Sequence, residues 1–195
     1  MRKTPYTEGL WYNTHDEEKG IVIVSTFGTG KSFIGTNPKY SNCIIDLNNA
    51  PFKYTEASKL SGHKRYEWIE QNKGLDKGVV NPEFPQNYFS AILDAIGKYK
   101  FVLVSLWSAV EMCRASNIDY WIVVPSVDLK DEYVMRIVDR GNPKEFAQKM
   151  SDNFEYYVNR LMVCPYAKRK IILKSGEFLE DVLREYIWFQ NQKLI

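Results

Sequence analysis

The chain has 195 residues, of which 45% are hydrophobic and 26% are charged, and these values suit one globular domain with a sizeable core. Lys and Arg number 26 against 24 Asp and Glu, so the net charge of +2 makes a nucleic-acid partner possible but not favoured. The cysteines Cys43, Cys113 and Cys164 form no CxxC pair, which argues against a disulfide framework or a zinc site. No apolar run reaches the ~18 residues of a membrane span, and the first residues lack the apolar stretch of a signal peptide. We therefore expect a cytoplasmic protein with no membrane partner.

Strand-like and helix-like segments alternate along the chain, which predicts a parallel sheet with helices on its faces. The predicted strands, rich in β-branched residues, are 21–24, 43–47, 101–106, 120–125 and 170–173. The predicted helices begin near 31, 87, 108, 129, 143 and 177, and the last three reach about 140, 161 and 192. This pattern is typical of a doubly wound α/β fold, and we expect a single domain over 1–195.

Two of these helices have sequence signals for their first turn. Ser108 and Glu111 have the spacing of a capping box, and Asn142-Pro143 is a typical helix start. After the second start, apolar residues form one stripe that we interpret as core: Phe146, Met150, Phe154, Tyr157 and Leu161.

The segment of about 48–86 is polar and irregular, and we expect short helices and loops there, less stable than the core. The role of residues 1–20 stays open between an edge strand, an oligomer contact and a flexible arm. The oligomeric state is likewise open.

The strongest motif lies between the first predicted strand and the first predicted helix. Residues 25–32 read Ser-Thr-Phe-Gly-Thr-Gly-Lys-Ser, which matches the phosphate-loop pattern GxxxxGK[ST] except that Ser25 replaces its first glycine. Glycines let backbone N–H groups turn inward around phosphate oxygens, Lys31 would reach the outer phosphates, and Ser32 would bind Mg²⁺. We predict that ATP contacts Thr26, Phe27, Gly28, Thr29, Gly30, Lys31, Ser32 and Phe33.

This loop resembles that of the adenylate-kinase-like P-loop kinases, which place Pro-Gly-x-Gly-Lys before Ser or Thr; Phe27 stands where they have Pro. The order of segments over about 20–192 is also similar to small phage-type and bacterial nucleotide kinases. The resemblance implies a five-stranded parallel sheet in the order 2-3-1-4-5 with a phosphate loop and a helical lid. It also implies ATP and Mg²⁺ as cofactors and a small-molecule acceptor, bound by the subregion of about 48–86.

Asp46 ends the second predicted strand, and ligands of doubly wound sheets lie beyond the carboxyl ends of the strands. The resemblance implies that its carboxylate binds the acceptor hydroxyl and takes its proton; the alternative is an Asp that caps the following turn. The next segment carries aromatic residues that either stack on the acceptor or form a small core: Phe52, Tyr54, Tyr66 and Trp68. Lys64 and Arg65 either bind an acceptor phosphate or form a solvated charge pair.

Arg136 and Arg140 lie four apart and share one face of a predicted helix. The resemblance implies a lid of about 129–161 that brings both arginines to the transferring phosphate. The alternative is a pair of surface ion pairs with Glu132 and Asp139. The resemblance also implies that the loop at Lys174–Glu177 flanks the adenine, with Gly176 letting the backbone approach the base.

The third predicted strand ends in Ser105-Leu106-Trp107, without the Asp that usually ends a Walker B strand. A motor ATPase is therefore disfavoured, because motors need that carboxylate to organise metal and water. The leading hypothesis is a nucleoside or nucleotide kinase. The alternatives are a P-loop kinase acting on another hydroxyl, in a sugar or a nucleic acid, and an ATP-binding switch.

Overall fold

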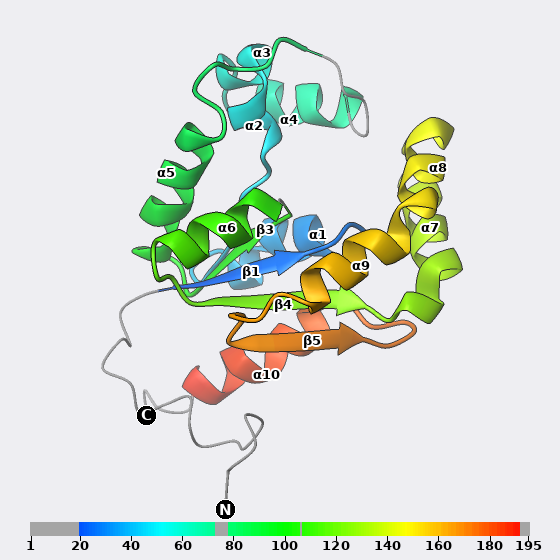
Figure 1. The fold of residues 1–195 in the computed structure, drawn as a ribbon. Coiled ribbons are helices and arrows are strands. Elements are labelled where there is room, and N and C mark those ends of the chain that lie inside the picture. The colour runs from blue at the N-terminus through cyan, green and yellow to red at the C-terminus, as the bar shows by residue number, and fades with distance from the viewer. Residues whose placement is uncertain (1–19, 73–77, 106, 192–195) are drawn as a thin grey trace, which may run out of the picture.

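The computed structural model describes residues 20–72, 78–105 and 107–191. Its centre is a sheet of five parallel strands: β1 (Ile21–Ser25), β2 (Ile44–Asp46), β3 (Phe101–Val104), β4 (Tyr120–Pro125) and β5 (Arg169–Leu173). Their order is β2-β3-β1-β4-β5 (Figure 1). The predicted fold class and sheet order are confirmed.

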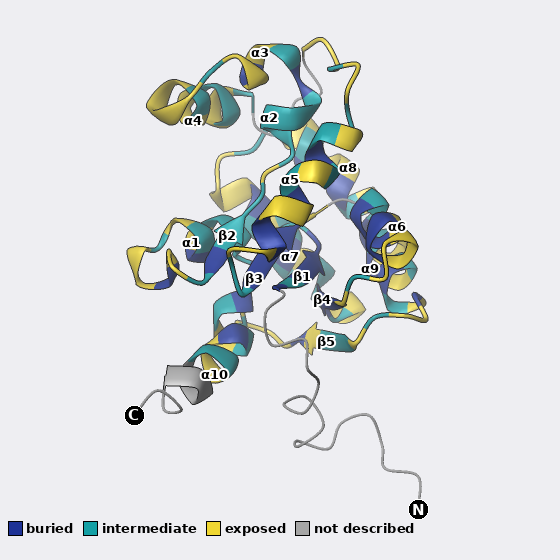
Figure 2. Cartoon of the chain, turned by 90° about the vertical axis from the view of Figure 1, so that its left-hand side faces the viewer, coloured by how far each residue is buried: buried dark blue, intermediate teal, exposed yellow. Residues whose placement is uncertain are grey.

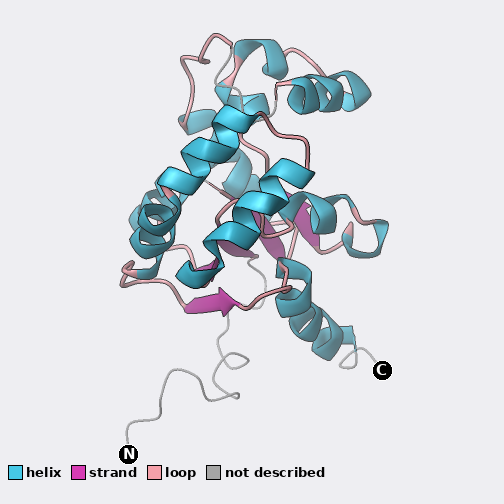
Figure 3. Ribbon diagram, turned by 90° about the vertical axis from the view of Figure 1, so that its right-hand side faces the viewer, coloured by secondary structure: helices cyan, strands magenta, loops and turns pink. Residues whose placement is uncertain are grey.

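Ten α-helices accompany the strands in the described residues, and Figure 3 shows them enclosing the sheet. They are α1 (Lys31–Thr36), α2 (Ala50–Lys53), α3 (Thr55–Ser58), α4 (Gly62–Gln71), α5 (Gln86–Ile96), α6 (Trp107–Ala115), α7 (Lys130–Asp139), α8 (Lys144–Asp152), α9 (Phe154–Met162) and α10 (Leu179–Asn191). Short 3-10 turns lie at Pro38–Tyr40 and Val127–Leu129.

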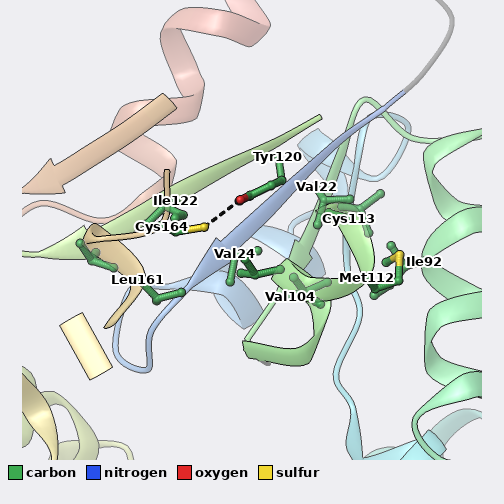
Figure 4. Packing of buried hydrophobic residues seen from close by; sticks show 14 of the residues in the cluster. Val22, Val24, Ile92, Val104, Met112, Cys113, Tyr120, Ile122, Leu161 and Cys164 are labelled. Atoms are coloured by element: carbon green, nitrogen blue, oxygen red, sulfur yellow. Dashed lines mark hydrogen bonds between the residues drawn. The ribbon is translucent and has the colours of Figure 1, made fainter. Parts of the chain in front are cut away.

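Alternate residues of the central strands enter two separate cores, as expected for a strand buried on both faces. Val22 and Val24 of β1 pack with α5, α6 and α9, whereas Ile23 packs with α1 and α10. Figure 4 shows the first core, in which Tyr120 and Cys164 are hydrogen-bonded at 2.8 Å. The sheet is thus fixed from both sides, which holds the carboxyl ends of its strands at one edge.

Two helix predictions differ from the structure. The stripe from Phe146 to Leu161 does not lie on one helix, because the chain leaves helical geometry at Asn153 (φ −107°, ψ 7°) between α8 and α9. The helix α6 already includes Trp107, and its indole N–H donates to Glu111 at 3.0 Å. The predicted capping box therefore does not form. Ser108 lies inside the helix rather than at its N-cap, and Glu111 bonds the Trp107 indole instead.

Helices α2, α3 and α4 form a group beyond the carboxyl end of β2 (Figure 1), and Phe52 of α2 packs against the first core. No residue of α4 is buried, and Figure 2 shows exposed residues along it. Two aromatic residues of this group have different partners: Tyr54 lies 5.7 Å from Trp68 of the same group, whereas Phe52 lies 5.3 Å from Tyr88 of α5, between ring centroids. Within the described residues, no helix has the length and apolar character needed to cross a membrane.

Gly35 lets α1 approach the end of β2. A Cβ at Gly35 would lie 2.5 Å from the Cβ of Asp46 and 3.1 Å from its backbone nitrogen, closer than van der Waals contact allows. A side chain at position 35 would therefore move Asp46 or the helix that follows the phosphate loop.

We predict that Gly35→Ala lowers stability by about 1–3 kcal/mol, the usual cost of overpacking, although alanine is the better helix former. Chemical denaturation measures this change. Gly97→Ala is the matched control, because its Cβ would meet only Asp94 O at 3.6 Å. Equal stability changes in the two variants would contradict the close approach at Gly35.

Candidate active site

A cavity of about 710 Å³ opens at the carboxyl edge of the sheet, between the α2–α4 group and the helices α7 to α9. Three regions that the sequence singled out separately line it together. They contribute residues 26–32 of the loop, Asn48, Asn49, Tyr66, Ile69 and Glu70 of the acceptor segment, and Arg136, Ile137, Arg140, Phe146, Met150, Tyr157, Arg160 and Leu161 of the lid region. Asp46 and Ser105 lie at its floor, at or just beyond the ends of β2 and β3.

In the loop after β1, the carbonyl groups of residues 28–30 are bonded to groups outside the loop. Gly28 O accepts from Arg136, Thr29 O accepts from the N–H of Leu179 at 2.8 Å, and Gly30 O accepts from the N–H of Ile34 at 3.1 Å. Among the described residues, no hydrogen bond uses the N–H groups of Gly28, Thr29 or Gly30. Donors left open in a turn of this kind form an anion-binding nest.

Both glycines of the loop have left-handed backbone geometry, with φ of 72° at Gly28 and 88° at Gly30. Other residues rarely adopt such angles. A Cβ at Gly28 would also lie only 2.9 Å from the Tyr133 ring of α7. The glycines are thus required both by the turn and by the close approach of α7.

Ser25, which replaces the first glycine of the motif, takes part in the loop through its side chain. It is fully buried, and its Oγ lies 3.2 Å from Thr29 Oγ1 and 3.2 Å from the Lys31 ammonium. The neighbouring Thr26 is 7% exposed, and its Oγ1 has no hydrogen-bond partner among the described residues. An orphaned buried hydroxyl usually marks a place for a polar ligand or water.

The Lys31 ammonium lies inside the loop and donates to the carbonyls of Ser25 and Thr26. Burial lowers the pKa of Lys31 to about 8, against an opposing effect of the Asp46 carboxylate. Burial likewise raises the pKa of Asp46, whereas Lys31, a hydrogen bond from Ser32 and Arg140 act in the opposite direction. The site therefore has one cation and one carboxylate, both poorly solvated, around the position predicted for the outer phosphates.

The two predicted lid arginines point to different places. Arg140 donates from Nη2 to Ser32 Oγ at 3.1 Å, and its side chain lines the cavity. Arg136 instead donates to Gly28 O and Glu177 O, both at 3.1 Å, and forms an ion pair with Glu132. In this structure the donors of Arg136 therefore hold protein groups at the back of the loop, although the residue also lines the cavity, and the contact of both arginines with the phosphate stays a prediction.

Two further predicted nucleotide contacts lie outside the cavity lining that the described residues form. Phe33 points from α1 into solvent and is 65% exposed, so only its backbone remains near the loop. The N–H of Gly176 donates to Glu132 at 3.0 Å, although its φ of 77° agrees with the predicted need for glycine.

The acceptor half of the cavity contains residues that the sequence did not single out. The guanidinium of Arg160 lies 4.3 Å from the Trp107 ring centroid, and Arg160 also donates to the hydroxyl of Tyr156 at 2.8 Å. No motif marks single residues on two distant helices, so nothing in the sequence pairs them. Of the predicted charge pair, Arg65 donates to Leu60 O at 2.6 Å, and neither Lys64 nor Arg65 is part of the described lining.

A Mg²⁺ ion fits the residues at the loop. Ser32 Oγ lies beside the Asp46 carboxylate, so a hydroxyl and a carboxylate oxygen, both hard ligands, converge at the phosphate position. The described residues contain no group of three His, Cys, Asp or Glu side chains placed to hold a metal. Such an ion would thus depend on phosphate and water oxygens for most of its ligands.

Comparisons with known proteins do not identify a family for the chain. No family model matches the chain, and no curated protein matches it. A solved structure with a related arrangement is a gluconokinase from Sinorhizobium meliloti 1021, at a TM-score of 0.44 and 14% identity, covering 89% of this chain and 97% of that chain.

The lowered pKa of Lys31 predicts how nucleotide affinity depends on pH. Phosphate oxygens stabilise the charged ammonium, so the pKa of Lys31 in the bound state must exceed its value of about 8 in the free protein. Affinity for Mg·ATP should therefore be constant from pH 7 to 8 and fall roughly tenfold per unit above that.

Calorimetry in buffers of different ionisation enthalpy measures both the affinity and the accompanying proton uptake. Lys31→Arg is the control, because a guanidinium stays charged over this range. Constant affinity up to pH 9.5 in the unchanged protein would contradict the lowered pKa of Lys31 in the free protein.

Proposed function

We propose that the chain is a P-loop phosphotransferase that moves the terminal phosphate of ATP to a small acceptor, and that the acceptor is a nucleoside or nucleotide. The observation that carries the proposal is the loop itself. The carbonyls of Gly28 and Thr29 are bound from outside the loop, the N–H groups of residues 28–30 are unused among the described residues, and the Lys31 ammonium lies within the loop beside Asp46. A helix also begins at Lys31, whose N-terminal field favours anions.

The residues of the cavity supply the parts that phosphoryl transfer needs. The loop N–H groups and Lys31 hold the β- and γ-phosphates, and Arg140 lies where its guanidinium reaches the equatorial oxygens of the transferring group. The acceptor hydroxyl would lie at Asp46, whose carboxylate orients it and takes its proton. The bond from Pγ to the bridging oxygen breaks, the bond from the acceptor oxygen to Pγ forms, and ADP leaves.

Asp46 fits this role in its environment. Burial raises the pKa of its carboxyl group, which makes the carboxylate a better proton acceptor than a solvated one. The hydroxyl of Tyr88 donates to Leu47 O at 2.8 Å and so fixes the chain just after Asp46. When bound, Mg²⁺ would neutralise charge on the phosphates, with Ser32 as its protein ligand and Asp46 within reach of its water shell.

The lining of the acceptor half is compatible with a nucleoside or nucleotide acceptor. Side chains of Tyr66, Trp107 and Tyr157 face this half of the cavity, and aromatic rings stack well on bases. Such rings also bind the apolar faces of sugars, so a sugar kinase is the second candidate. A switch that only hydrolyses ATP is less well supported, because Asp46 would then face no hydroxyl.

We predict that nucleosides or nucleotides, and not simple sugars, stimulate ADP release from Mg·ATP. In the same assay Asp46→Asn should lower turnover by roughly 10²–10⁴, the usual contribution of a general base, while ATP affinity changes little. Steady-state kinetics with a panel of acceptors and calorimetry with ATP measure the two quantities. Lys31→Ala is the negative control and should abolish transfer with every acceptor.

Stimulation by sugars alone would reject the nucleoside assignment while leaving the phosphotransferase proposal in place. Equal loss of ATP affinity and turnover in Asp46→Asn would place Asp46 on the donor side instead. No stimulation by any acceptor would favour the ATP-binding switch.

The different surroundings of the two arginines predict different defects. Arg140→Ala should slow single-turnover transfer by roughly 10²–10³ with nearly unchanged ATP affinity, as for a group that acts mainly on the transition state. Arg136→Ala should instead weaken ATP binding and lower the melting temperature, because Gly28 O and Glu177 O lose their side-chain donor and Glu132 loses its ion pair.

Arg184→Ala is a control at an exposed arginine of α10, where ion pairs contribute ~0–1 kcal/mol. Identical behaviour of Arg140→Ala and Arg184→Ala would remove Arg140 from the proposed mechanism.

A further inference from the structure

The sheet order determines where the base of a bound nucleotide must lie. Asp46, at the end of β2, places the acceptor on the β3–β2 side of the phosphate loop. The rest of the donor nucleotide then leaves on the opposite side, beyond β4 and β5. The segments that follow these strands are 126–140, which includes α7, and 174–178.

Hydrogen bonds join these two segments directly to each other. The Glu132 carboxylate of α7 accepts from Ser175 Oγ at 2.7 Å and from the N–H of Gly176 at 3.0 Å. Arg136, also on α7, donates through both Nη atoms to Glu177 O at 3.1 Å. The backbone groups of this loop that face α7, and that a base edge would use, are therefore already bonded.

The stacking position beside the loop is also filled. The Arg136 guanidinium lies between two rings, 4.0 Å from the centroid of Phe178 and 4.3 Å from that of Tyr133. The Phe178 ring lies against the phosphate loop, since a Cβ at Gly30 would be 3.2 Å from its Cδ1. A planar guanidinium is a common partner for a base, but here the rings of Phe178 and Tyr133 are already in contact with it.

The lining of the cavity is consistent with these contacts between α7 and the loop at 174–178. Its described lining includes Arg136, Ile137 and Arg140 of α7 but no residue of 174–178. The space that continues the phosphate site therefore ends at the Glu132–Arg136–Phe178 group rather than passing between α7 and the loop.

We infer, on the basis of the proposed function, that the donor site binds the triphosphate and does not read the base, and that Glu132 is the specificity-determining residue that keeps the base out. The base of the donor then lies against solvent, and nucleoside triphosphates are used with little discrimination. The alternative is that a base displaces Phe178 and breaks the Glu132 bonds on binding.

Binding to the whole chain separates these two cases. A base stacked in a protein site tightens binding by about tenfold to a hundredfold. Calorimetry should compare Mg²⁺ complexes of ATP, GTP, UTP and inorganic tripolyphosphate at pH 7.5. We expect four dissociation constants within about fivefold of one another.

Removing the carboxylate tests the role of Glu132 itself. In Glu132→Ala, ATP should gain about fivefold over tripolyphosphate, because the Gly176 N–H and the Ser175 hydroxyl lose their acceptor and become open to a base. Asp131→Ala is the matched control, being exposed on the same turn of α7, and should leave the ratio unchanged. Phe178→Ala opens the stacking position independently, and thermal melts verify that each variant is folded.

Each outcome has a distinct meaning. ATP binding more than about thirtyfold tighter than UTP and tripolyphosphate in the unchanged protein would overturn the inference while leaving the phosphate loop intact. Unchanged selectivity in both Glu132→Ala and Phe178→Ala would overturn the assignment to Glu132. Failure of all four ligands to bind would instead reject the proposed function.

Discussion

The site depends on the way the phosphate loop is held from behind. Arg136 binds Gly28 O, the first N–H of α10 binds Thr29 O, and Lys31 binds Thr26 O. Because the carbonyls of Gly28 and Thr29 are fixed by helices outside the loop and Thr26 O is fixed by Lys31 within it, the peptide planes keep orientations that leave the N–H groups of residues 28–30 unbonded. A loop rich in glycine would otherwise lose this arrangement to its own conformational entropy. The proposed anion site thus depends on α7 and α10 as much as on the loop sequence.

The sheet order then separates the two halves of the proposed reaction. With β1 in the centre, the end of β2 brings Asp46 to one side of the loop, and β4 leads into α7 on the other. Gly35 allows α1 to lie against Asp46, so the carboxylate and the Ser32 hydroxyl are held in contact. Arg140 bonds to that same hydroxyl. The Asp46 carboxylate, the Ser32 hydroxyl and the Arg140 guanidinium are therefore linked by hydrogen bonds.

The parts of this site that the sequence could predict are those encoded locally. The motif at 25–32 and the buried strands identify the fold, since phosphate loops follow a strand and precede a helix. The direction of Arg136 could not be predicted, because it depends on carbonyls at Gly28 and Glu177 that are distant in sequence. The contact of Arg160 with Trp107 and the end of helical geometry at Asn153 could not be predicted either. Both depend on tertiary contacts, which the spacing of apolar residues in the sequence does not reveal.

The central claim is that the N–H groups of Gly28, Thr29 and Gly30 face a bound anion. The amide spectrum of ¹⁵N-labelled protein, followed while Mg²⁺ and tripolyphosphate are added, observes these groups one by one. The account predicts saturable downfield shifts of these three amide protons, larger than those of any other described residue outside α1, and their loss in Lys31→Ala. Shifts scattered over surface lysines, with these three amides unmoved, would contradict it.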